Sequence, residues 1–436
     1  MLTDYGKLHV SVARHAAVRP DGFDAAVREW RAALARGEAL RVRGSGHGLS
    51  GASLPRQDET LFLTRGLDRY RVVAPGLLAV GSGAIVWDIR DFVAQCGMRL
   101  PIYNGGWAGP TLGGFVCAGG LGLRVPPSER ESLIAAGAAG KTDKSELASL
   151  SEKYGGLWAQ VAELTMIDGR GRLHSFRPGD RDFPWIFASM GQFGLLLEVT
   201  LRIYRRPGEV ADLPVGRSGR IPVSNPLNPN ETDRLPPADG IDWVYWFTAL
   251  VPPGEEEAAW KIVGNWSDEH RDTLRPTGGW VGPLQEGVPI GFRYLVRHKA
   301  PPPPMLYPRE EDFLVLGVMA VCSGIGTDPA EAALRRAERA FVAQIVDRGW
   351  SLYCQAENLT RSLDFRSYLG PDRWARFCEL KTRFDPEDRI NVGEVRPGSG
   401  PPPLDARRVR QAAAAVRRVL APQRSARETR SSDLRA

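Results

Sequence analysis

A glycine-rich segment with one histidine is the first part of this sequence whose residue types could do chemistry. Residues 44–51 read GSGHGLSG, so four of the eight positions are glycine and His47 stands among them. Glycine permits positive φ and lets a backbone N–H approach a ligand without a Cβ in between. Successive N–H groups in such a turn form a nest for an anion, typically a phosphate. The segment predicts a phosphate-binding loop, although a purely structural glycine turn fits the same pattern.

The loop differs from the dinucleotide fingerprint of the doubly wound fold. That fingerprint requires a helix directly after the glycines and an acidic residue about 20 positions further on. Here Ala52–Arg56 follow the glycines, and Pro55 argues against a helix at that point. A different kind of phosphate loop is therefore required.

A second glycine-rich block covers residues 98–124 and contains eight glycines, with Thr111 in its middle. So many glycines cost conformational entropy on folding, and a hydrophobic core gains nothing from the missing side chains. Close approach of the backbone to a flat or phosphorylated ligand is the better explanation. Residues 125–150 are rich in Ala, Ser and Lys, and we expect a mobile excursion there.

Mixed helices and strands must position these two blocks. Apolar residues at helical spacing predict a helix over 20–38, with Asp21 as its cap, and another over 85–97 that ends at Gly97. Short apolar runs predict strands. They lie at 40–42, 60–64, 70–75, 77–84, in an Asp-Gly hairpin over 161–171, and in 191–203 after a glycine turn.

The character of the sequence changes around residue 207. Residues 213–240 are rich in Pro, Asn, Gly and Asp, which predicts a long irregular loop. Beyond it, strand-like runs and helical patterns predict a second α+β domain over 207–375. Its strands are expected at 243–251 and 313–321, its helices at about 254–264 and 329–348, and a further helix over 371–384.

Composition excludes several function classes. The 436 residues are 43% hydrophobic and 25% charged, as in an ordinary globular protein, and contain no apolar run long enough to span a membrane. The net charge of +6 resides in residues 401–436, with nine Arg against three acidic residues, so a basic core for nucleic acid is not supported. We expect this tail to be disordered.

The cysteines and the N-terminus indicate the compartment. The five cysteines are odd in number and far apart, which argues against a disulfide framework or a zinc site, and no metal is expected. Residues 1–6 contain neither a basic nor an apolar signal region, so a cytoplasmic protein is expected.

In their order along the chain, these segments resemble the vanillyl-alcohol oxidase / p-cresol methylhydroxylase (PCMH-type) family of FAD enzymes. The resemblance covers about residues 15–206 and 366–396. The motifs that carry it are R-G-x-G-H-x-x-x-G over 43–51, L-T-x-x-L-x-x-Y over 63–70, V-G-x-G-A-x-x-x-D over 80–88, T-L-G-G-x-x-x-x-G-G-x-G over 111–122, G-Q-F-G with its strand over 191–203, and K-x-x-F-D-P-x-x-x-x-N-x-G over 381–393.

The resemblance implies an α+β fold with a two-part FAD-binding domain and an α+β cap that shapes the substrate pocket. Residues 1–206 and a C-terminal return over 376–400 would hold FAD, and residues 207–375 would form the cap. The residues that the resemblance places against the cofactor are Arg43, Gly44, Ser45, Gly46, His47, Gly48, Thr111, Gly113, Gly114, Gly120, Gln192 and Asn391. Asn391 and Lys381 either contact the flavin or brace the helix.

In relatives with the same Gly-His pair, the histidine bonds covalently to the 8α-methyl carbon of the flavin, so the resemblance implies that His47 is a flavin tether. The alternative is that His47 only hydrogen-bonds a phosphate. Some relatives add a cysteine link, but Gly109 stands at the matching position here, so a second covalent bond is not expected.

The histidine loop and residues 368–377 are most similar to cytokinin dehydrogenases. Those enzymes keep an aspartate base in a W-T-D-Y segment just before the second glycine block. This chain has Tyr103-Asn104-Gly105-Gly106-Trp107 there, without a carboxylate. The departure argues against activity on cytokinins.

The implied reaction is oxidation of a C–H bond next to oxygen or nitrogen in a small molecule (an alcohol, sugar, lactone or amine). Hydride passes to flavin N5 while a base takes the O–H or N–H proton, and O2 or another acceptor reoxidises the flavin. The expected catalytic residues are Tyr353, Glu357, Asp364 and Tyr368. Tyr245, His298 and Arg361 are further candidates on the cap.

Two other functions fit the same residues. The first is an NAD(P)H-dependent flavin reductase of an activated double bond. The second is a noncatalytic nucleotide- or carbohydrate-binding module, in which tryptophans such as Trp243 and Trp246 would stack on sugars.

Overall fold

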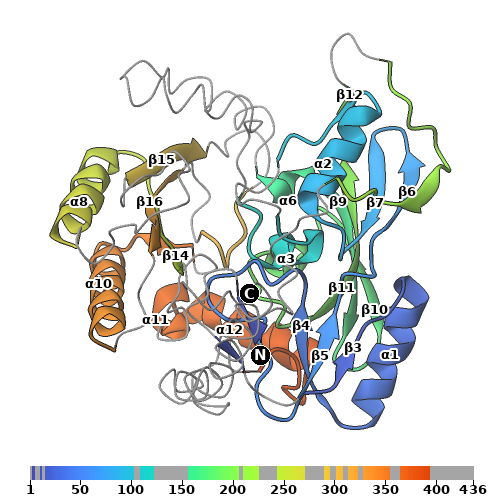
Figure 1. Cartoon of the computed structure of the whole chain (residues 1–436), viewed down its shortest axis with the longest axis horizontal. Helices are drawn as coiled ribbons and strands as arrows, with labels where there is room; N and C mark the ends of the chain where they lie inside the picture. Colours follow the sequence, from blue (N-terminus) through green and yellow to red (C-terminus); the bar gives the residue numbers. More distant parts are fainter. Residues whose placement is uncertain are drawn as a thin grey trace, which may run out of the picture.

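The structure is a computed structural model with two α+β parts that face each other (Figure 1). It describes residues 2–4, 10–11, 15–102, 109–121, 156–205, 210–224, 243–270, 289–294, 301–307, 313–322, 328–353 and 364–392. No helix within these ranges is both long and apolar enough to cross a bilayer.

A small parallel sheet leads into the first glycine-rich loop. Its strands are β3 (Ala17–Val18), β5 (Glu59–Leu63) and β4 (Ala39–Arg43), in that order, and Leu40 of β4 also bridges in parallel to Ile390 near the C-terminal end of the described chain. The loop begins directly after β4, so the position of this strand sets the position of the loop.

The helix α1 (Phe23–Ala35) confirms the predicted amphipathic helix but not its predicted cap. Gly22 is the N-cap residue, and no side chain caps the helix. The carboxylate of Asp21 accepts a hydrogen bond from Arg220 instead. The prediction of Asp21 as the cap was therefore wrong, because an ion pair that is distant in sequence holds this side chain.

A larger antiparallel sheet forms the main part of the first domain. Its strand order is β10 (Leu173–Phe176), β9 (Val161–Asp168), β11 (Gly194–Arg202), β7 (Leu77–Gly81), β6 (Arg69–Ala74) and β13 (Ser218–Arg220). The predicted hairpin and the predicted long strand after a glycine turn are confirmed as β9–β10 and β11.

Strand β11 is buried on both faces because successive side chains point to opposite sides of a strand. Leu195 and Leu197 pack with Trp30 of α1, whereas Leu196 and Val199 belong to the larger core on the other face. The pairing of β11 with β9 shifts register between Leu196 and Glu198, so Val199 lies on the same face as Leu196 and not on that of Leu197. Burial on both faces explains why the strand reads as an almost continuous apolar run.

Strand β13 corrects the predicted loop over 213–240. The backbone of Ser218–Arg220 pairs with Arg69–Arg71 of β6 at the edge of the large sheet. The short polar sequence of this strand has no apolar alternation, so only its partner reveals it. The sheet of the first domain thus includes residues from the range predicted for the cap.

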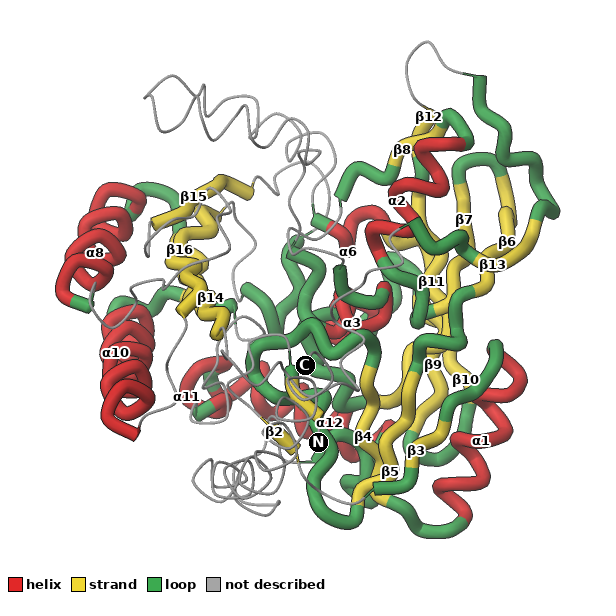
Figure 2. The backbone as a smooth tube through the Cα atoms, in the orientation of Figure 1, coloured by secondary structure: helices red, strands yellow, loops and turns green. Residues whose placement is uncertain are grey.

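Helices lie beside this sheet, and Figure 2 labels α2, α3 and α6 among them. They are α2 (Val86–Gln95), α3 (Leu112–Cys117), α6 (Leu157–Gln160) and α7 (Phe183–Ile186), and the short strands β8 (Met98–Arg99) and β12 (Tyr204–Arg205) pair beside them. Gly97, at φ 68°, follows α2 as predicted.

The second part confirms the predicted α+β character of the cap. Its antiparallel sheet has the order β15 (Pro289–Tyr294), β16 (Phe313–Cys322), β14 (Trp243–Val251) and β17 (Ser351–Leu352). Helices α8 (Glu256–Glu269) and α10 (Asp328–Asp347) cover it, and Trp266 Nε1 of α8 donates to the Ala337 carbonyl of α10 at 2.9 Å.

The chain then returns to the first domain through α11 (Phe365–Leu369) and α12 (Pro371–Phe384). Phe377 and Phe384 of α12 pack on Phe193, just before β11, with ring centroids 5.4 and 6.1 Å away. A small hairpin near the N-terminus pairs β1 (Leu2–Thr3) with β2 (Val10–Ser11).

Candidate functional site

The two glycine-rich segments pack directly against each other. A Cβ at Gly44 would overlap the Oγ1 atom of Thr111, so this close contact requires glycine. Ser45 Oγ donates to the Gly109 carbonyl at 3.2 Å and gives the segments a second link. Thr111 also caps α3, because its Oγ1 accepts from the Gly114 N–H at 3.3 Å. The sequence-predicted residues Gly44, Ser45, Thr111 and Gly114 are thus brought together.

The Arg43 side chain packs against the first loop and holds its turn in place. Its side chain is buried and donates from Nη1 to Ser53 Oγ at 3.1 Å. Gly46 has φ 70°, and a Cβ there would overlap the Arg43 guanidinium. The predicted cofactor residue Arg43 therefore lies where it shapes the turn at Gly46.

The glycines of the two segments divide into packed and open positions. A Cβ at Gly113 would lie 2.8 Å from Ser82 Cβ, and one at Gly120 would lie 2.7 Å from Leu157 Cβ. Gly48, in contrast, is exposed and has no heavy atom within 4 Å of its Cβ position. Gly114 is exposed too, but a Cβ there would lie 3.1 Å from Thr111 Oγ1. The open backbone at Gly48 is what a ligand could approach.

The electrostatics keep His47 neutral at physiological pH. The side chain is half-buried, and burial lowers its pKa to about 4. A neutral imidazole has a nitrogen lone pair available for bonding. Burial raises the pKa of the Cys117 thiol to about 12, so this cysteine is a poor nucleophile.

Two buried hydroxyls of this region lack a hydrogen-bond partner within the described ranges. They are Ser50 Oγ, at the end of the first loop, and Ser82 Oγ, which lies beside Gly113; both residues are 1% exposed. Buried hydroxyls normally have partners. Together with the exposed backbone at Gly48, these hydroxyls suit a phosphate-bearing cofactor such as FAD.

A buried ion pair that the sequence reasoning missed holds the far end of the first loop. Arg41 donates to both carboxylate oxygens of Glu59 at 2.9 and 2.7 Å, and also to the carbonyls of Ala52 and Val392. The sequence hints at this ion pair only through a charged residue at the centre of strand β4 and an acidic residue at the start of β5.

The predicted cofactor residues Gln192 and Asn391 are occupied with protein partners. Gln192 Nε2 donates to the Asn391 carbonyl at 2.8 Å. The Asn391 amide bonds to the backbone of Val42, Met190 and Gly191. Lys381 is 1% exposed and donates to the Gln192 carbonyl at 3.0 Å, which agrees with the bracing role considered for it.

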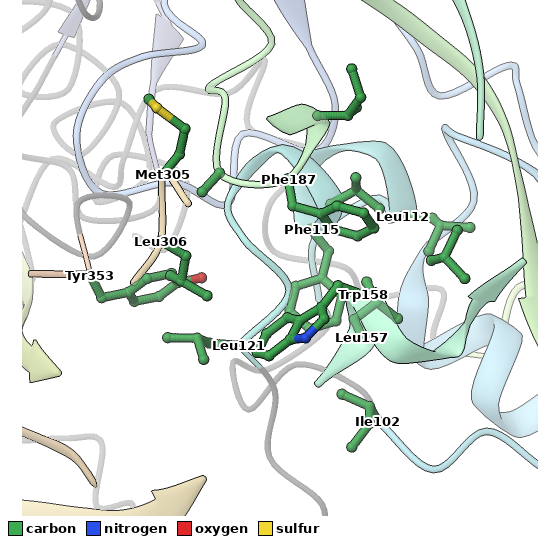
Figure 3. Packing of buried hydrophobic residues seen from close by; sticks show 14 of the residues in the cluster. Ile102, Leu112, Phe115, Leu121, Leu157, Trp158, Phe187, Met305, Leu306 and Tyr353 are labelled. Atoms are coloured by element: carbon green, nitrogen blue, oxygen red, sulfur yellow. The ribbon is translucent and has the colours of Figure 1, made fainter. Parts of the chain in front are cut away.

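The predicted catalytic residues occupy different environments. Tyr353 is buried at the junction of the two parts, where Figure 3 shows its ring directed toward Leu306 and Leu121. Tyr368 accepts from the Leu352 N–H at 2.8 Å and donates to the Leu352 carbonyl at 3.0 Å.

Asp364 caps α11 on an exposed surface. Its carboxylate accepts from the Arg366 N–H at 3.1 Å and from Ser367 Oγ at 2.5 Å. The hydrogen bond from Ser367 is the main cause of its lowered pKa. Glu357, His298 and Arg361 lie outside the described residues, as does the side chain of Tyr245.

The cap touches the second glycine segment at Gly119. A Cβ there would lie 3.0 Å from Leu306 Cδ1, and Met305, Leu306 and Tyr353 belong to the same apolar cluster as Leu121 (Figure 3). The cap and the glycine-rich segments therefore meet in a region closed by apolar side chains.

Comparison with known proteins finds similarities that cover part of the chain. Residues 15–130 match the family described as FAD binding domain. A segment of 120 residues is 31% identical to cytokinin dehydrogenase 5 of Oryza sativa subsp. japonica, and it covers 27% of this chain and 22% of that protein. The chain thus matches about a fifth of the length of this curated relative.

A comparison with solved structures covers a larger part of the chain. A structure of an alkyldihydroxyacetonephosphate synthase covers 86% of this chain and 75% of its own chain, with a TM-score of 0.50 and 11% sequence identity. The likeness shows a shared fold. The predicted resemblance to PCMH-type FAD-binding proteins and the predicted fold class are both confirmed.

Proposed function

We propose that this protein is an FAD-dependent oxidoreductase that oxidises a C–H bond next to oxygen or nitrogen in a small molecule. The observation that carries the proposal is the packed pair of glycine-rich segments, with open backbone at Gly48 and a neutral imidazole at His47. A bound flavin would supply the hydride acceptor that no side chain can provide.

The loop residues have distinct roles in this proposal. The FAD pyrophosphate would accept hydrogen bonds from the N–H groups of Gly44 to Gly48. The hydroxyls of Ser50 and Ser82 would donate to the same part of the cofactor. Arg43 and Thr111 would keep the two segments in register, because each fills the space next to a glycine. Pre-ordered donors of this kind bind an anion without further reorganisation.

We further propose that His47 attaches the flavin covalently. The bond from an imidazole nitrogen to the 8α carbon would replace one N–H and one C–H bond, and the two electrons released would pass through the flavin to O2 or another acceptor. The support is the low pKa of His47, because the neutral imidazole is the form that can bond to carbon. Cys117 offers no second attachment, since its thiol stays protonated at neutral pH. Acid precipitation should leave flavin absorbance with the wild-type polypeptide, whereas His47→Ala should release it. Complete release from the wild-type protein would contradict the tether.

Tyr353 is the predicted catalytic residue that the proposal retains for the proton transfer. Its hydroxyl belongs to the cap and lies at the apolar junction with the second glycine segment. Exclusion of water at such a junction strengthens any hydrogen bond to the substrate. Asp364 and Tyr368 are engaged in capping α11 and in linking α11 to β17.

The experiment that tests the function begins with the absorption spectrum of the purified protein. A flavin spectrum should be present, or should appear after incubation with FAD. Anaerobic bleaching by one member of a panel of alcohols, sugars, lactones and amines would then identify the substrate class. Bleaching by NADPH alone would instead identify a reductase, and protein that stays colourless in excess FAD would contradict the proposal. Admission of O2 or of a dye distinguishes oxidase from dehydrogenase.

A further inference from the structure

Asn391 occupies the junction between the strand that leads into the first glycine loop and the segment before β11. Its N–H donates to the Leu40 carbonyl at 2.9 Å, and its Oδ1 accepts from the Val42 N–H at 2.9 Å. Its Nδ2 donates to the Gly191 carbonyl at 2.9 Å and to the Met190 carbonyl at 3.2 Å. One buried side chain therefore joins β4 to residues 190–191.

Residues 188–191 are in turn attached to the second glycine segment. The Ala188 N–H donates to the Val116 carbonyl at 3.2 Å, and the Met190 N–H donates to the Cys117 carbonyl at 3.1 Å. Both acceptors belong to α3, which follows Thr111. Asn391 thus connects the loop after β4 with the helix of the second segment, although the three elements are far apart in sequence.

Lys381 holds the return segment in place behind Asn391. Its ammonium group is buried and contacts the Gln192 and Ile390 carbonyls at 3.0 Å each. It also pairs with Asp385 Oδ2 at 2.7 Å and with Asp388 Oδ1 at 3.1 Å. A buried ammonium is stable only when such partners compensate its lost hydration. The position of residues 390–391 is therefore strongly determined.

Backbone strain is concentrated at the same junction. Ala188, Met190 and Asn391 have φ values of 57°, 54° and 47°, and they are three of the five non-glycine residues with positive φ among the described ones. Such conformations cost about 1–3 kcal/mol each and persist where the surrounding structure over-determines them, often at functional sites.

We propose that Asn391, supported by Lys381, is a positioning residue that sets the spacing of the two glycine-rich segments for FAD. This inference rests on the proposed flavoprotein function. Asn391 would affect the cofactor indirectly, by holding the backbone of the two segments in place. Its side chain does not bind FAD itself, because its two amide protons and its oxygen are already bonded within the protein. Its loss should weaken FAD binding by more than it destabilises the fold.

The test is Asn391→Gly, because glycine keeps the positive φ and removes only the side-chain bonds. It is measured in a His47→Ala background, where FAD binding is reversible whether or not a tether forms. Quenching of FAD fluorescence should show an affinity about tenfold lower than in His47→Ala alone, the equivalent of about 1.4 kcal/mol. Hydrogen exchange of the Val42 amide, which loses its acceptor, should become faster.

Two controls separate positioning from general stability. Val93→Ala removes buried side-chain volume from α2, which makes none of these hydrogen bonds, and should lower the unfolding midpoint without changing FAD affinity. Gln192→Leu removes the bond to the Asn391 carbonyl and should weaken FAD binding to a smaller extent. Unchanged FAD affinity in Asn391→Gly would overturn the inference. Absence of FAD binding in the parent protein would overturn the proposed function itself.

Discussion

The side chain of Thr111 occupies the space that a Cβ on Gly44 would need. The same threonine caps α3 through the Gly114 N–H, so one residue shapes both glycine-rich segments. Gly44 and Thr111 are 67 positions apart in sequence (111 − 44), and their contact holds the two loops as one unit. A ligand that touches both loops meets a surface with a defined spacing, which lowers the cost of ordering it on binding.

This contact predicts the effect of a single methyl group. Gly44→Ala should push the first loop away from α3, lower the stability of the protein and weaken FAD binding by at least about tenfold. Thermal unfolding and FAD titration measure the two effects.

Gly48→Ala is the matched control in the same loop, because no heavy atom lies within 4 Å of its Cβ position. Its unfolding midpoint should equal that of the wild type. Thr111→Ala combined with Gly44→Ala should restore part of the lost stability, since the smaller side chain vacates the contested space. No difference in stability between Gly44→Ala and Gly48→Ala would contradict the packed-loop interpretation.

His47 should make the stability of the flavin-free protein depend on pH. The unfolded chain binds a proton at this residue near pH 6.5, whereas the folded protein binds it only near pH 4. Between these values the unfolded state carries more protons, so the free energy of unfolding should fall as the pH is lowered from 6.5 toward 4. Urea unfolding at several pH values measures this dependence. The slope should be smaller in His47→Gln, and identical slopes in the two proteins would contradict the assigned burial.

The Arg41–Glu59 pair should be essential for the first domain. Glu59→Gln leaves the buried guanidinium of Arg41 without its counter-charge, and breaking such a pair costs about 3–5 kcal/mol. Urea unfolding measures the loss. The control is Glu38→Gln, which removes an ion pair with the exposed Arg36 and should leave the unfolding midpoint close to that of the wild type. An equal loss of stability in Glu59→Gln and Glu38→Gln would show that the burial of Arg41 does not determine how much its ion pair contributes to stability.

Tyr353 and Tyr368 form a matched pair of tyrosines with different expected roles. If Tyr353 transfers the substrate proton, Tyr353→Phe should lower kcat by about 10²–10⁴-fold. Tyr368→Phe removes two hydrogen bonds to Leu352 and should lower stability while kcat is retained. Steady-state kinetics on the identified substrate and thermal unfolding distinguish them. An unchanged kcat in Tyr353→Phe would exclude that tyrosine from the proton transfer.

The local pattern of the sequence was sufficient to predict most helices and strands of the fold. The strands β9 and β11 and the helices α1 and α12 follow from alternation and helical spacing, because these patterns depend on neighbours close in the chain. The glycine-rich segments and His47 could also be recognised, since the requirement for bare backbone is visible as residue type.

The tertiary structure alone decided what the individual residues of the site do. The Arg43 guanidinium packs against Gly46, and Gly113 packs against Ser82. The Asn391 side chain accepts a hydrogen bond from Val42 of β4. None of these contacts can be predicted from the type of the residue. Strand β13 was invisible because its pairing with β6, rather than its composition, makes it a strand. The physical reason is the same in each case. Most of these roles come from partners far away in sequence, such as Asn391 with Val42 and β13 with β6, and only the folded chain brings such partners together. Arg43 and Gly46 are close in sequence, but the conformation of the loop decides that the guanidinium lies against this glycine.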